Sequence, residues 1–600
     1  MKIRMIKILS ITLIAVTIMT GCTTATQRAQ TSAASSDVTA TDNIGTSGTQ
    51  DTTDTADSTQ STSGTTTTLS SSEVVVDTEF TARDIEVGYE AASATSIVLD
   101  GSSIQVSGEG ATAEGKVLTI TKEGSYIVAG SLDDGQIIID AGDKDKIQLI
   151  LNGVSINCQS NAPIYIKNAD KVFITLAEGT KNSLTDGSEY VQTDDNNVDG
   201  VIYSKADLTL NGSGTLSIQG NYKQGIVAKD DLIITGGNYE ISAVKDALNG
   251  KDCVKIKDGS FTLNTTTGNG IQSKNSEDST KGYVYISGGT INITNCKEGI
   301  EGTVIIIEDG TIVINATDDG LNAASASSSS TTTDTSQVIS SMSTNTSSTN
   351  TSSTNTSGTN TSSTDDIIIA TATDDPIASS ATVTSPDTGD DTTITRGPGG
   401  MKRGQAPAGE APQGGFLPDD KGQGNFGGAG GGQFEVDENC YIRISGGTII
   451  VNAQGDGIDS NGSLYVSGGT INVNGPTENN NGSLDYNGVA EITGGTVIVV
   501  GSAGMSQSFG ETSTQCAILY NMDSAVAAGS TLTLADEDGN EVVSFTPNKQ
   551  YQSIVISSPK LVQGENYTLT INNQTFDVTL SSISTSYGQS TGLGQRGMGR

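Results

Sequence analysis

Acidic and amide residues recur at regular spacing through the middle of the chain, in a pattern that could hold a divalent cation. One set follows the pattern Asp/Asn-Gly-apolar, as at Asn269-Gly270-Ile271, and a second follows a Lys-Asp step, as at Lys229-Asp230. Carboxylate and amide oxygens are the hard ligands that Ca²⁺ prefers, and the ion takes about six to eight oxygens. The sequence therefore predicts bound Ca²⁺, with these candidate ligands: Asp230, Asp246, Asp252, Asn269, Asn275 and Asp278.

Turn formation is the competing explanation for the same residues. Asp-Gly and Asn-Gly steps are common turn formers, so a solvated turn explains any single copy. It explains the recurrence of the Lys-Asp steps less well. A calcium site is therefore the preferred hypothesis, and turn formation stays open as the alternative at each position.

A repeated motif supplies the elements that must position these residues. It reads apolar-x-apolar-x-Gly-Gly-Thr-apolar-x-apolar, with clear copies at residues 284–293, 442–451, 464–473 and 490–499. Its second glycine recurs after 22 residues from Gly237 to Gly259, and after 21 residues from Gly289 to Gly310. A longer interval, 30 residues from Gly259 to Gly289, fits a repeat that carries an extra loop near residues 275–281. A period of about 22 residues is typical of one coil of a solenoid.

Apolar and polar residues alternate within each copy, which predicts short strands with one buried face. The fold class expected is all-β: a right-handed parallel β-helix with capping elements and a small C-terminal β-rich segment. A β-sandwich of hairpins is the alternative, but hairpins have no need to keep Gly-Gly-Thr in the same flanking pattern. The residues expected in the inward stacks are Ile286, Ile291, Ile293, Val451, Val466, Ile471 and Val473.

Composition divides the chain further. Residues 23–78 are mostly Ser, Thr, Ala, Asp, Gln and Gly, a mixture that buries too little apolar surface to order itself. Residues 323–433 are low in complexity and should loop out between two coils. The expected parts are 1–22 signal peptide, 23–78 disordered stalk, 79–322 first part of the β-helix, 323–433 insertion, 434–514 second part of the β-helix, 515–584 C-terminal β-rich segment and 585–600 Gly-rich tail.

The first 22 residues have the features of a secretory signal. A basic start with Lys2, Arg4 and Lys7 precedes an apolar run over residues 8–19, and Gly21-Cys22 follows. A cysteine directly after the small residues resembles the bacterial lipoprotein signal, in which Cys22 would be lipidated. This predicts a secreted protein anchored by lipid to the outer face of the cell membrane, without a spanning helix.

Composition excludes several functions. The chain has 31 basic and 69 acidic residues, a formal charge of −38, so a nucleic acid is not an expected partner. It contains no His and no Trp, which removes His-based acid–base chemistry and Trp sugar platforms. The cysteines after Cys22 show no metal-type spacing and are expected to be small buried hydrophobes, although one disulfide remains open: Cys158, Cys253, Cys296, Cys440 and Cys516.

Several strings, taken in their order along the chain, resemble the β-helical, calcium-binding carbohydrate-binding domain of bacterial surface lipoproteins. The resemblance covers most of residues 85–322 and 434–580 and is carried by residues 147–153, 202–208, 229–232, 251–252 and 281–286. It implies bound Ca²⁺ and affinity for plant-type polysaccharides, acidic ones included. The chain departs from the family pattern at Ala206, Ala247, Asn269 and Asn275, which puts the number of calcium sites in doubt.

The function expected is therefore calcium-assisted binding of polysaccharide at the cell surface, without catalytic residues. The sugar contacts expected are Tyr203, Tyr222 and Tyr285. A calcium-dependent polysaccharide lyase is the main alternative, and it would need a base such as a lysine of lowered pKa. A lysine beside several carboxylates should instead hold its proton more tightly, which argues against the lyase. A purely structural surface adhesin is the third possibility.

Overall fold

The computed structural model describes residues 74–326 and 435–589. The predicted signal peptide, the lipidation site Cys22, most of the predicted stalk and insertion, and residues 590–600 lie outside the described residues. Among the described residues, the regular secondary structure consists of β-strands and one four-residue helix, α1 (Ala82–Ile85). No helix among these residues is long and apolar enough to cross a membrane.

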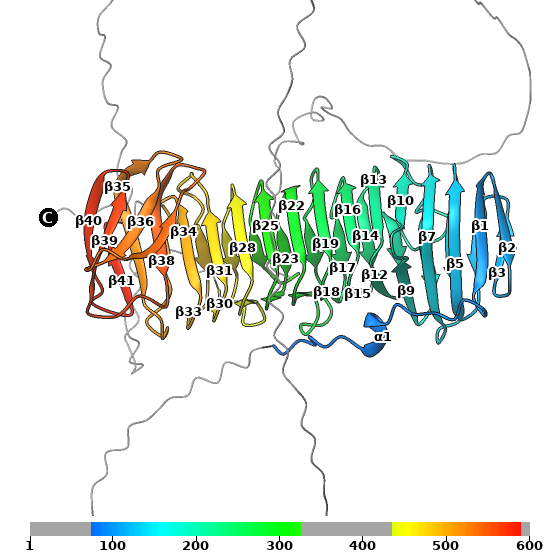
Figure 1. Cartoon of the computed structure of the whole chain (residues 1–600), viewed down its shortest axis with the longest axis horizontal. Helices are drawn as coiled ribbons and strands as arrows, with labels where there is room; N and C mark the ends of the chain where they lie inside the picture. The colour runs from blue at the N-terminus through cyan, green and yellow to red at the C-terminus, as the bar shows by residue number, and fades with distance from the viewer. Residues whose placement is uncertain (1–73, 327–434, 590–600) are drawn as a thin grey trace, which may run out of the picture. The chain divides into compact units, whose positions relative to one another are not determined.

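The strands stack coil upon coil as a parallel β-helix with three faces (Figure 1). Face 1 is a twelve-stranded sheet, parallel except for the antiparallel pair β3–β4. Its strands are β3 (Ala111–Glu114), β4 (Val117–Ile120), β6 (Gln136–Asp140), β8 (Ile164–Asn168), β11 (Gly200–Ser204), β14 (Gln224–Ala228), β17 (Leu248–Gly250), β20 (Ile271–Ser273), β23 (Ile300–Gly302), β26 (Leu321–Ala323), β29 (Ile458–Ser460) and β32 (Leu484–Tyr486).

Faces 2 and 3 share the long strands β1 (Thr95–Gly101), β5 (Gly124–Leu132) and β7 (Lys146–Cys158), which run through both. Face 2 continues with β9 (Lys171–Leu176), β12 (Asp207–Gly212), β15 (Asp231–Ile234), β18 (Cys253–Ile256), β21 (Tyr283–Ile286), β24 (Val304–Ile307), β27 (Tyr441–Ile444), β30 (Ser463–Val466) and β33 (Ala490–Ile492). Face 3 continues with β10 (Lys181–Asp186), β13 (Thr215–Gly220), β16 (Asn238–Ala243), β19 (Ser260–Thr265), β22 (Thr290–Cys296), β25 (Thr311–Ala316), β28 (Thr448–Ala453), β31 (Thr470–Asn474) and β34 (Thr496–Gly501).

The Gly-Gly-Thr motif marks the corner where each coil turns from face 2 to face 3. Its second glycine has a positive φ in every copy, a conformation that glycine adopts at little cost. These glycines are Gly237, Gly259, Gly289, Gly310, Gly447, Gly469 and Gly495, with φ between 81° and 134°. The corner therefore explains why the motif recurs once per coil, and the predicted period is confirmed.

The interior is a continuous stack of aliphatic side chains. All seven residues expected to face inward are at most 2% exposed, which confirms the predicted alternation. Residues 274–282 form the extra loop of the long repeat, between β20 and β21. The stack continues across the low-complexity insertion, because β24 pairs directly with β27 and β26 with β29. The five cysteines of the described residues are buried and free.

Antiparallel pairs close both ends of the solenoid, where unpaired strand edges would otherwise invite aggregation. At the first coil, β2 (Ser103–Ser107) pairs with β1. At the last coil, β34 pairs with β38, and a separate four-stranded sheet with its own apolar core follows. The C-terminal strands are β35 (Ala517–Val526), β36 (Leu532–Asp536), β37 (Glu541–Phe545), β38 (Tyr551–Ser557), β39 (Asn566–Ile571), β40 (Gln574–Thr579) and β41 (Ser584–Tyr587).

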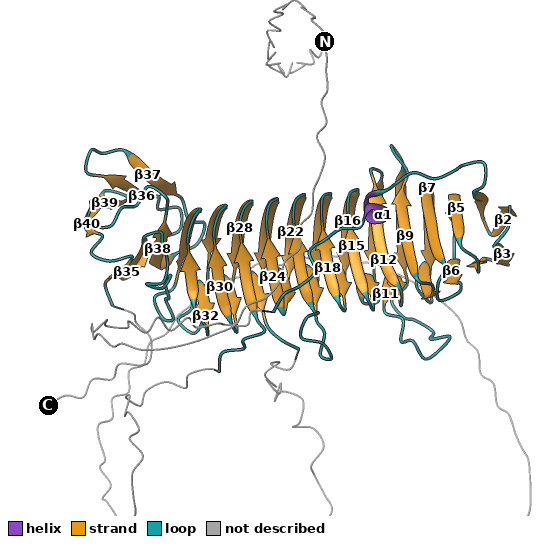
Figure 2. Cartoon of the chain, turned by 90° about the horizontal axis from the view of Figure 1, so that it is seen from below, coloured by secondary structure: helices purple, strands orange, loops and turns teal. Residues whose placement is uncertain are grey.

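Residues 74–86, here called the strap, cross the outside of face 2 from β27 back towards β9 (Figure 2). The hydroxyl of Tyr441 donates to the carbonyl of Val74 at 3.0 Å, and Lys255 pairs with Asp77 at 3.2 Å. Asp84, fully buried, pairs with Lys171 at 2.8 Å and accepts from Thr209 at 2.7 Å. Composition places residues 74–78 in the stalk, but these contacts join Val74 and Asp77 to strands of the solenoid.

Replacing Asp84 by Ala should destabilise the protein by about 3 kcal/mol, because it leaves Lys171 without its buried partner. Thermal or urea unfolding monitored by circular dichroism measures the change. Asp100→Ala, at an exposed position of β1, is the matched control. Equal stability of the two variants would show that the Asp84–Lys171 pair does not stabilise the fold.

Candidate metal centre

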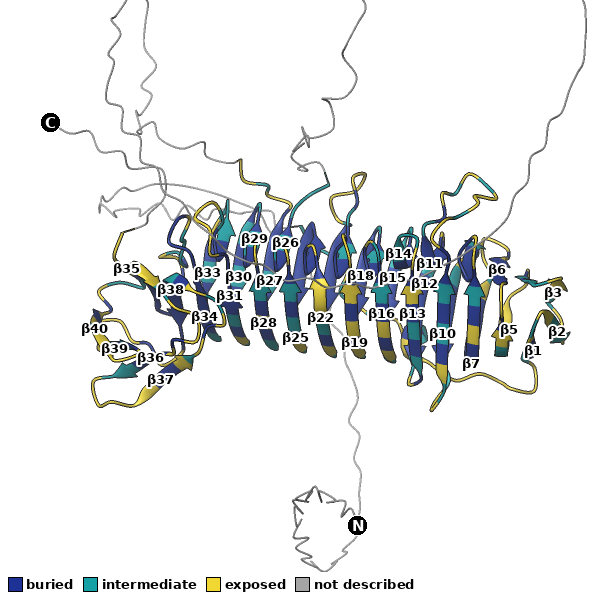
Figure 3. Cartoon of the chain, turned by 90° about the horizontal axis from the view of Figure 1, so that it is seen from above, coloured by how far each residue is buried: buried dark blue, intermediate teal, exposed yellow. Residues whose placement is uncertain are grey.

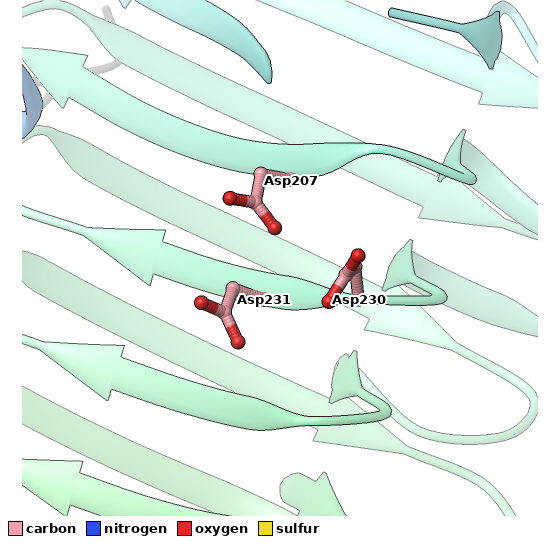
Figure 4. Close-up of side chains that lie close together, drawn as sticks. All are labelled: Asp207, Asp230 and Asp231. Carbon is pink, nitrogen blue, oxygen red and sulfur yellow. The ribbon is translucent and has the colours of Figure 1, made fainter. Parts of the chain in front are cut away.

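Three carboxylates meet where face 1 turns into face 2. Asp207 is the first residue of β12, and Asp231 is the first residue of β15. These two strands pair in parallel with Leu208 opposite Leu232, so the two aspartates occupy equivalent positions of successive coils. Asp230 precedes Asp231 in the turn (Figure 4). One carboxylate oxygen from each of the three lies within 4.8 Å of the others. The group is called the corner cluster below.

Burial and mutual repulsion both disfavour full ionisation of the corner cluster. Burial, together with the neighbouring Asp252 and Asp207, raises the pKa of Asp230 to about 7. Burial and the charge of Asp231 raise the pKa of Asp207. The nearest cation of Asp207 is Lys171, at 4.0 Å, and Lys171 is already paired more closely with Asp84. A divalent cation would supply the missing charge, and the carboxylate donors suit Ca²⁺.

Asp252 lies beside the corner cluster but already has a cation of its own. Lys281 forms a close ion pair with it, and Asn275 donates its side-chain amide to it at 2.6 Å. Burial acts to raise the pKa of Asp252. The side-chain hydrogen bonds with Lys281 and Asp230 outweigh burial, so the pKa of Asp252 is lowered. Asp252 therefore borders the cluster as a charge-balanced neighbour.

Two of the predicted ligands, Asn275 and Asp278, use their side-chain oxygens to accept hydrogen bonds within their own loop. The side-chain oxygen of Asn275 accepts the backbone N–H groups of Glu277 and Asp278, at 2.8 and 3.0 Å. Asp278 is exposed and accepts from the backbone and hydroxyl of Thr280. Both side chains thus organise the loop between β20 and β21, and neither belongs to the corner cluster.

Asp246 and Asn269 lie at the opposite edge of face 1, where the chain enters from face 3. Asp246 accepts the backbone N–H of Asn269 at 2.9 Å, and the oxygen of Asn269 accepts the N–H of Glu298 at 3.2 Å. Asp319 in turn accepts the N–H of Asp456 at 2.6 Å. Each side chain therefore caps a backbone donor of the next coil. Turn formation accounts for these bonds, and the structure does not bring Asp246 and Asn269 together with Asp230, so their role as metal ligands stays a prediction.

A second acidic cluster lies further along the same edge and was missed as a site. Single oxygens of Glu298, Asp318 and Asp319 lie within 4.8 Å of one another, and Lys297 pairs with Glu298 at 2.5 Å and with Asp318 at 3.4 Å. Burial, with the charges of Asp318 and Asp456, raises the pKa of Asp319 to about 9. Asp319 fits the Asp/Asn-Gly-apolar pattern, and Glu298-Gly299-Ile300 is a variant of it with Glu in the first position, so counting acids in register would have found this cluster.

Two of the three tyrosines expected to stack on sugar are covered. Tyr203 is 2% exposed and donates to the carbonyl of Asn196, and Tyr285 is 6% exposed with its ring 5.8 Å from that of Phe80 in the strap. Neither ring presents a free face, which corrects both predictions. Tyr222 is half-buried and stacks on Tyr190 with ring centroids 4.4 Å apart. Figure 3 shows that exposed residues gather on the loops and on parts of face 3.

Comparison with known proteins identifies the family. Residues 114–405 match the sequence model of a family described as carbohydrate-binding domain-containing protein. A relative with that description, from Acetivibrio thermocellus, is 39% identical over 208 residues, which are 34% of this chain and 72% of the relative. The chain belongs to this carbohydrate-binding domain family.

One solved structure is also similar in sequence. It is described as a polysaccharide lyase-like protein from C. thermocellum, in a gadolinium derivative, and is 36% identical. The match covers 38% of this chain and 93% of that chain, with a TM-score of 0.36. A TM-score this low supports no conclusion about shared geometry.

Without divalent cations, the protein should lose stability as pH rises from about 6 to about 9. Burial and neighbouring carboxylates raise the pKa of Asp230 and Asp456 to about 7 and that of Asp459 to about 8. Because these values exceed the ordinary 3.8, the folded state binds more protons than the unfolded state, and this stabilisation is lost as pH rises through them. Melting temperatures in EDTA across this range test the claim; a constant or rising value contradicts it.

Proposed function

We propose that the chain binds polysaccharide at the cell surface with Ca²⁺ held in the corner cluster. The observation that carries the proposal is the approach of Asp207, Asp230 and Asp231 within 4.8 Å, in a chain of the carbohydrate-binding domain family. Three carboxylates at this separation repel one another strongly unless a cation lies between them.

Bound Ca²⁺ would neutralise these carboxylates and leave coordination positions for oxygens of the polysaccharide. The three aspartates supply the protein's ligands, and Lys281 holds Asp252 beside them without competing for the ion. An acidic polysaccharide would otherwise be repelled, because the chain carries a formal charge of −38. An acidic, pectin-like polymer is therefore the ligand class that gains most from the cation, and a cellulosic polymer is the alternative.

A binding role without catalysis fits the lysines beside the corner cluster. Lys251 pairs with Glu277 at 2.7 Å, Lys229 lies 3.7 Å from Asp199, and Lys274 forms a close pair with Glu301. The bond to Glu277 raises the pKa of Lys251, and the bond to Asp252 raises the pKa of Lys281. A lyase base needs the opposite shift, so these lysines act as charge partners in the proposal.

Surface location completes the proposal. The apolar run and Cys22 after Gly21 would direct export and lipidation, and the Ser/Thr-rich segment that follows would separate the folded body from the membrane. Metabolic labelling with an alkyne-tagged fatty acid tests this, with Cys22→Ser as the control that should lose the label.

Asp230→Asn should weaken calcium binding by about tenfold or more, because it removes a ligand charge from the corner cluster. Isothermal titration with CaCl₂ measures the affinity. Asp278→Asn is the matched control, since it removes an exposed acid that is not one of the three cluster aspartates, and it should bind like the parent protein. Equal affinities for all three proteins would remove the corner cluster as the site.

Calcium should also increase retention of the protein on insoluble pectin, relative to EDTA, because it bridges two acidic partners. Pull-down with and without EDTA measures this retention. Ultraviolet absorbance of soluble polygalacturonate in the same buffers reports the unsaturated product of a lyase. A rising absorbance would contradict a purely binding role, and retention that EDTA leaves unchanged would contradict the role of calcium.

A further inference from the structure

A polar hollow of about 470 Å³ lies where the solenoid meets the C-terminal strands. Its volume falls within the range of roughly 300–1,000 Å³ typical of small-molecule sites. Face 3 contributes asparagines from three successive coils, and Lys549 enters from the loop between β37 and β38. The lining residues used below are Asn315, Asn452, Gln454, Thr477, Glu478 and Lys549.

Lys549 is half-buried and has no carboxylate partner among the described residues, although the chain is strongly acidic. Ten other lysines of the described chain form ion pairs within 4.0 Å. The ammonium of Lys549 instead donates to the carbonyls of Ala453, in a close contact, and Gly475, at 3.0 Å. An ammonium has three donors, so one remains for a ligand. Burial without a counter-charge lowers the pKa of Lys549 to about 8.

The hollow also contains an unpaired acceptor. Asn452 donates its side-chain amide to Asn315 at 3.1 Å, and its own side-chain oxygen is buried without a hydrogen-bond partner. Buried polar atoms without partners are rare and call for an explanation. Because this oxygen is buried, the Asn452 side chain would have to turn towards the hollow to accept from a sugar hydroxyl, whereas the exposed side chains of Gln454 and Thr477 offer polar contacts at the rim as they stand.

We propose that this hollow binds a uronic acid residue directly, with the sugar carboxylate on Lys549 and a sugar hydroxyl donating to Asn452. The proposal rests on the proposed polysaccharide-binding function, and adds a subsite that needs no bridging cation. Both proposed sugar contacts, Asn452 and Lys549, lie outside residues 114–405, which match the family model, although Asn315 in the wall of the hollow lies within them. The loop that carries Lys549 is anchored by the backbone N–H of Asn548, which donates to Asn474 at 3.0 Å.

The test is titration of the full-length protein with oligogalacturonate in EDTA, which removes calcium-bridged binding. Lys549→Gln should weaken this binding by about tenfold or more, because a charge-assisted bond is lost. Glu478→Gln, which removes an exposed carboxylate from the rim, is the matched control and should bind as tightly as the parent or more tightly. A neutral oligogalactan of equal length, or inorganic phosphate, should bind weakly to all three proteins.

Proton uptake gives a second readout that needs no variant. Burial lowers the pKa of Lys549 to about 8, and a bound carboxylate would raise it again, so binding near pH 8 should take up protons. Calorimetry in two buffers of different ionisation enthalpy measures this uptake, and zero uptake would overturn the assignment.

The two proposals fail in different ways. Polysaccharide binding that appears in calcium but vanishes in EDTA would overturn the subsite and leave the proposed function standing. Equal binding by Lys549→Gln and the parent in EDTA would also overturn the subsite. Tight binding of phosphate would show that the hollow is a general anion site and not a sugar subsite. Absence of polysaccharide binding in both buffers would overturn both proposals.

Discussion

Backbone hydrogen bonds between equivalent strands hold each position of one coil about 4.8 Å from the same position of the next coil. This spacing places Asp207 directly beside Asp231 at the corner between faces 1 and 2. It also stacks apolar residues into a continuous interior and brings Asn315 beside Asn452 on face 3. The pairing of strands therefore decides which side chains meet, in the core, in the acidic clusters and in the polar hollow.

The same spacing produces different chemistry at the two edges of face 1. At one edge, Asp246 and Asp319 each accept a backbone N–H from the following coil, so the backbone satisfies one of their oxygens. At the other edge, Asp207, Asp230 and Asp231 approach one another, and repulsion between them is balanced only in part by lysines. The corner cluster is proposed as a metal site because its three carboxylates approach one another, whereas N–H groups of the following coil satisfy Asp246 and Asp319.

Much of the fold follows from the sequence, because its signals are local and repeated. The second glycine of each motif marks a corner with positive φ, and alternation sets the inward faces, as at Ile286 and Val473. The site was predicted only in part. Asp230 belongs to the corner cluster, but the direction of Asn275 depends on how its loop closes on itself. Tyr285 was assigned to the surface because nothing in its own repeat indicates that the distant strap covers it.

In the proposed binding mechanism, a divalent ion occupies the corner cluster. Crystals of the full-length protein grown with Ca²⁺, and then exchanged into a lanthanide with strong anomalous scattering, would locate the ion without reference to affinity. We predict an anomalous peak bonded to carboxylate oxygens of Asp207, Asp230 and Asp231, at about 2.3–2.6 Å for the calcium form. A map with no peak among these three residues, at an ion concentration that fills other sites, would show that the corner cluster does not bind the ion.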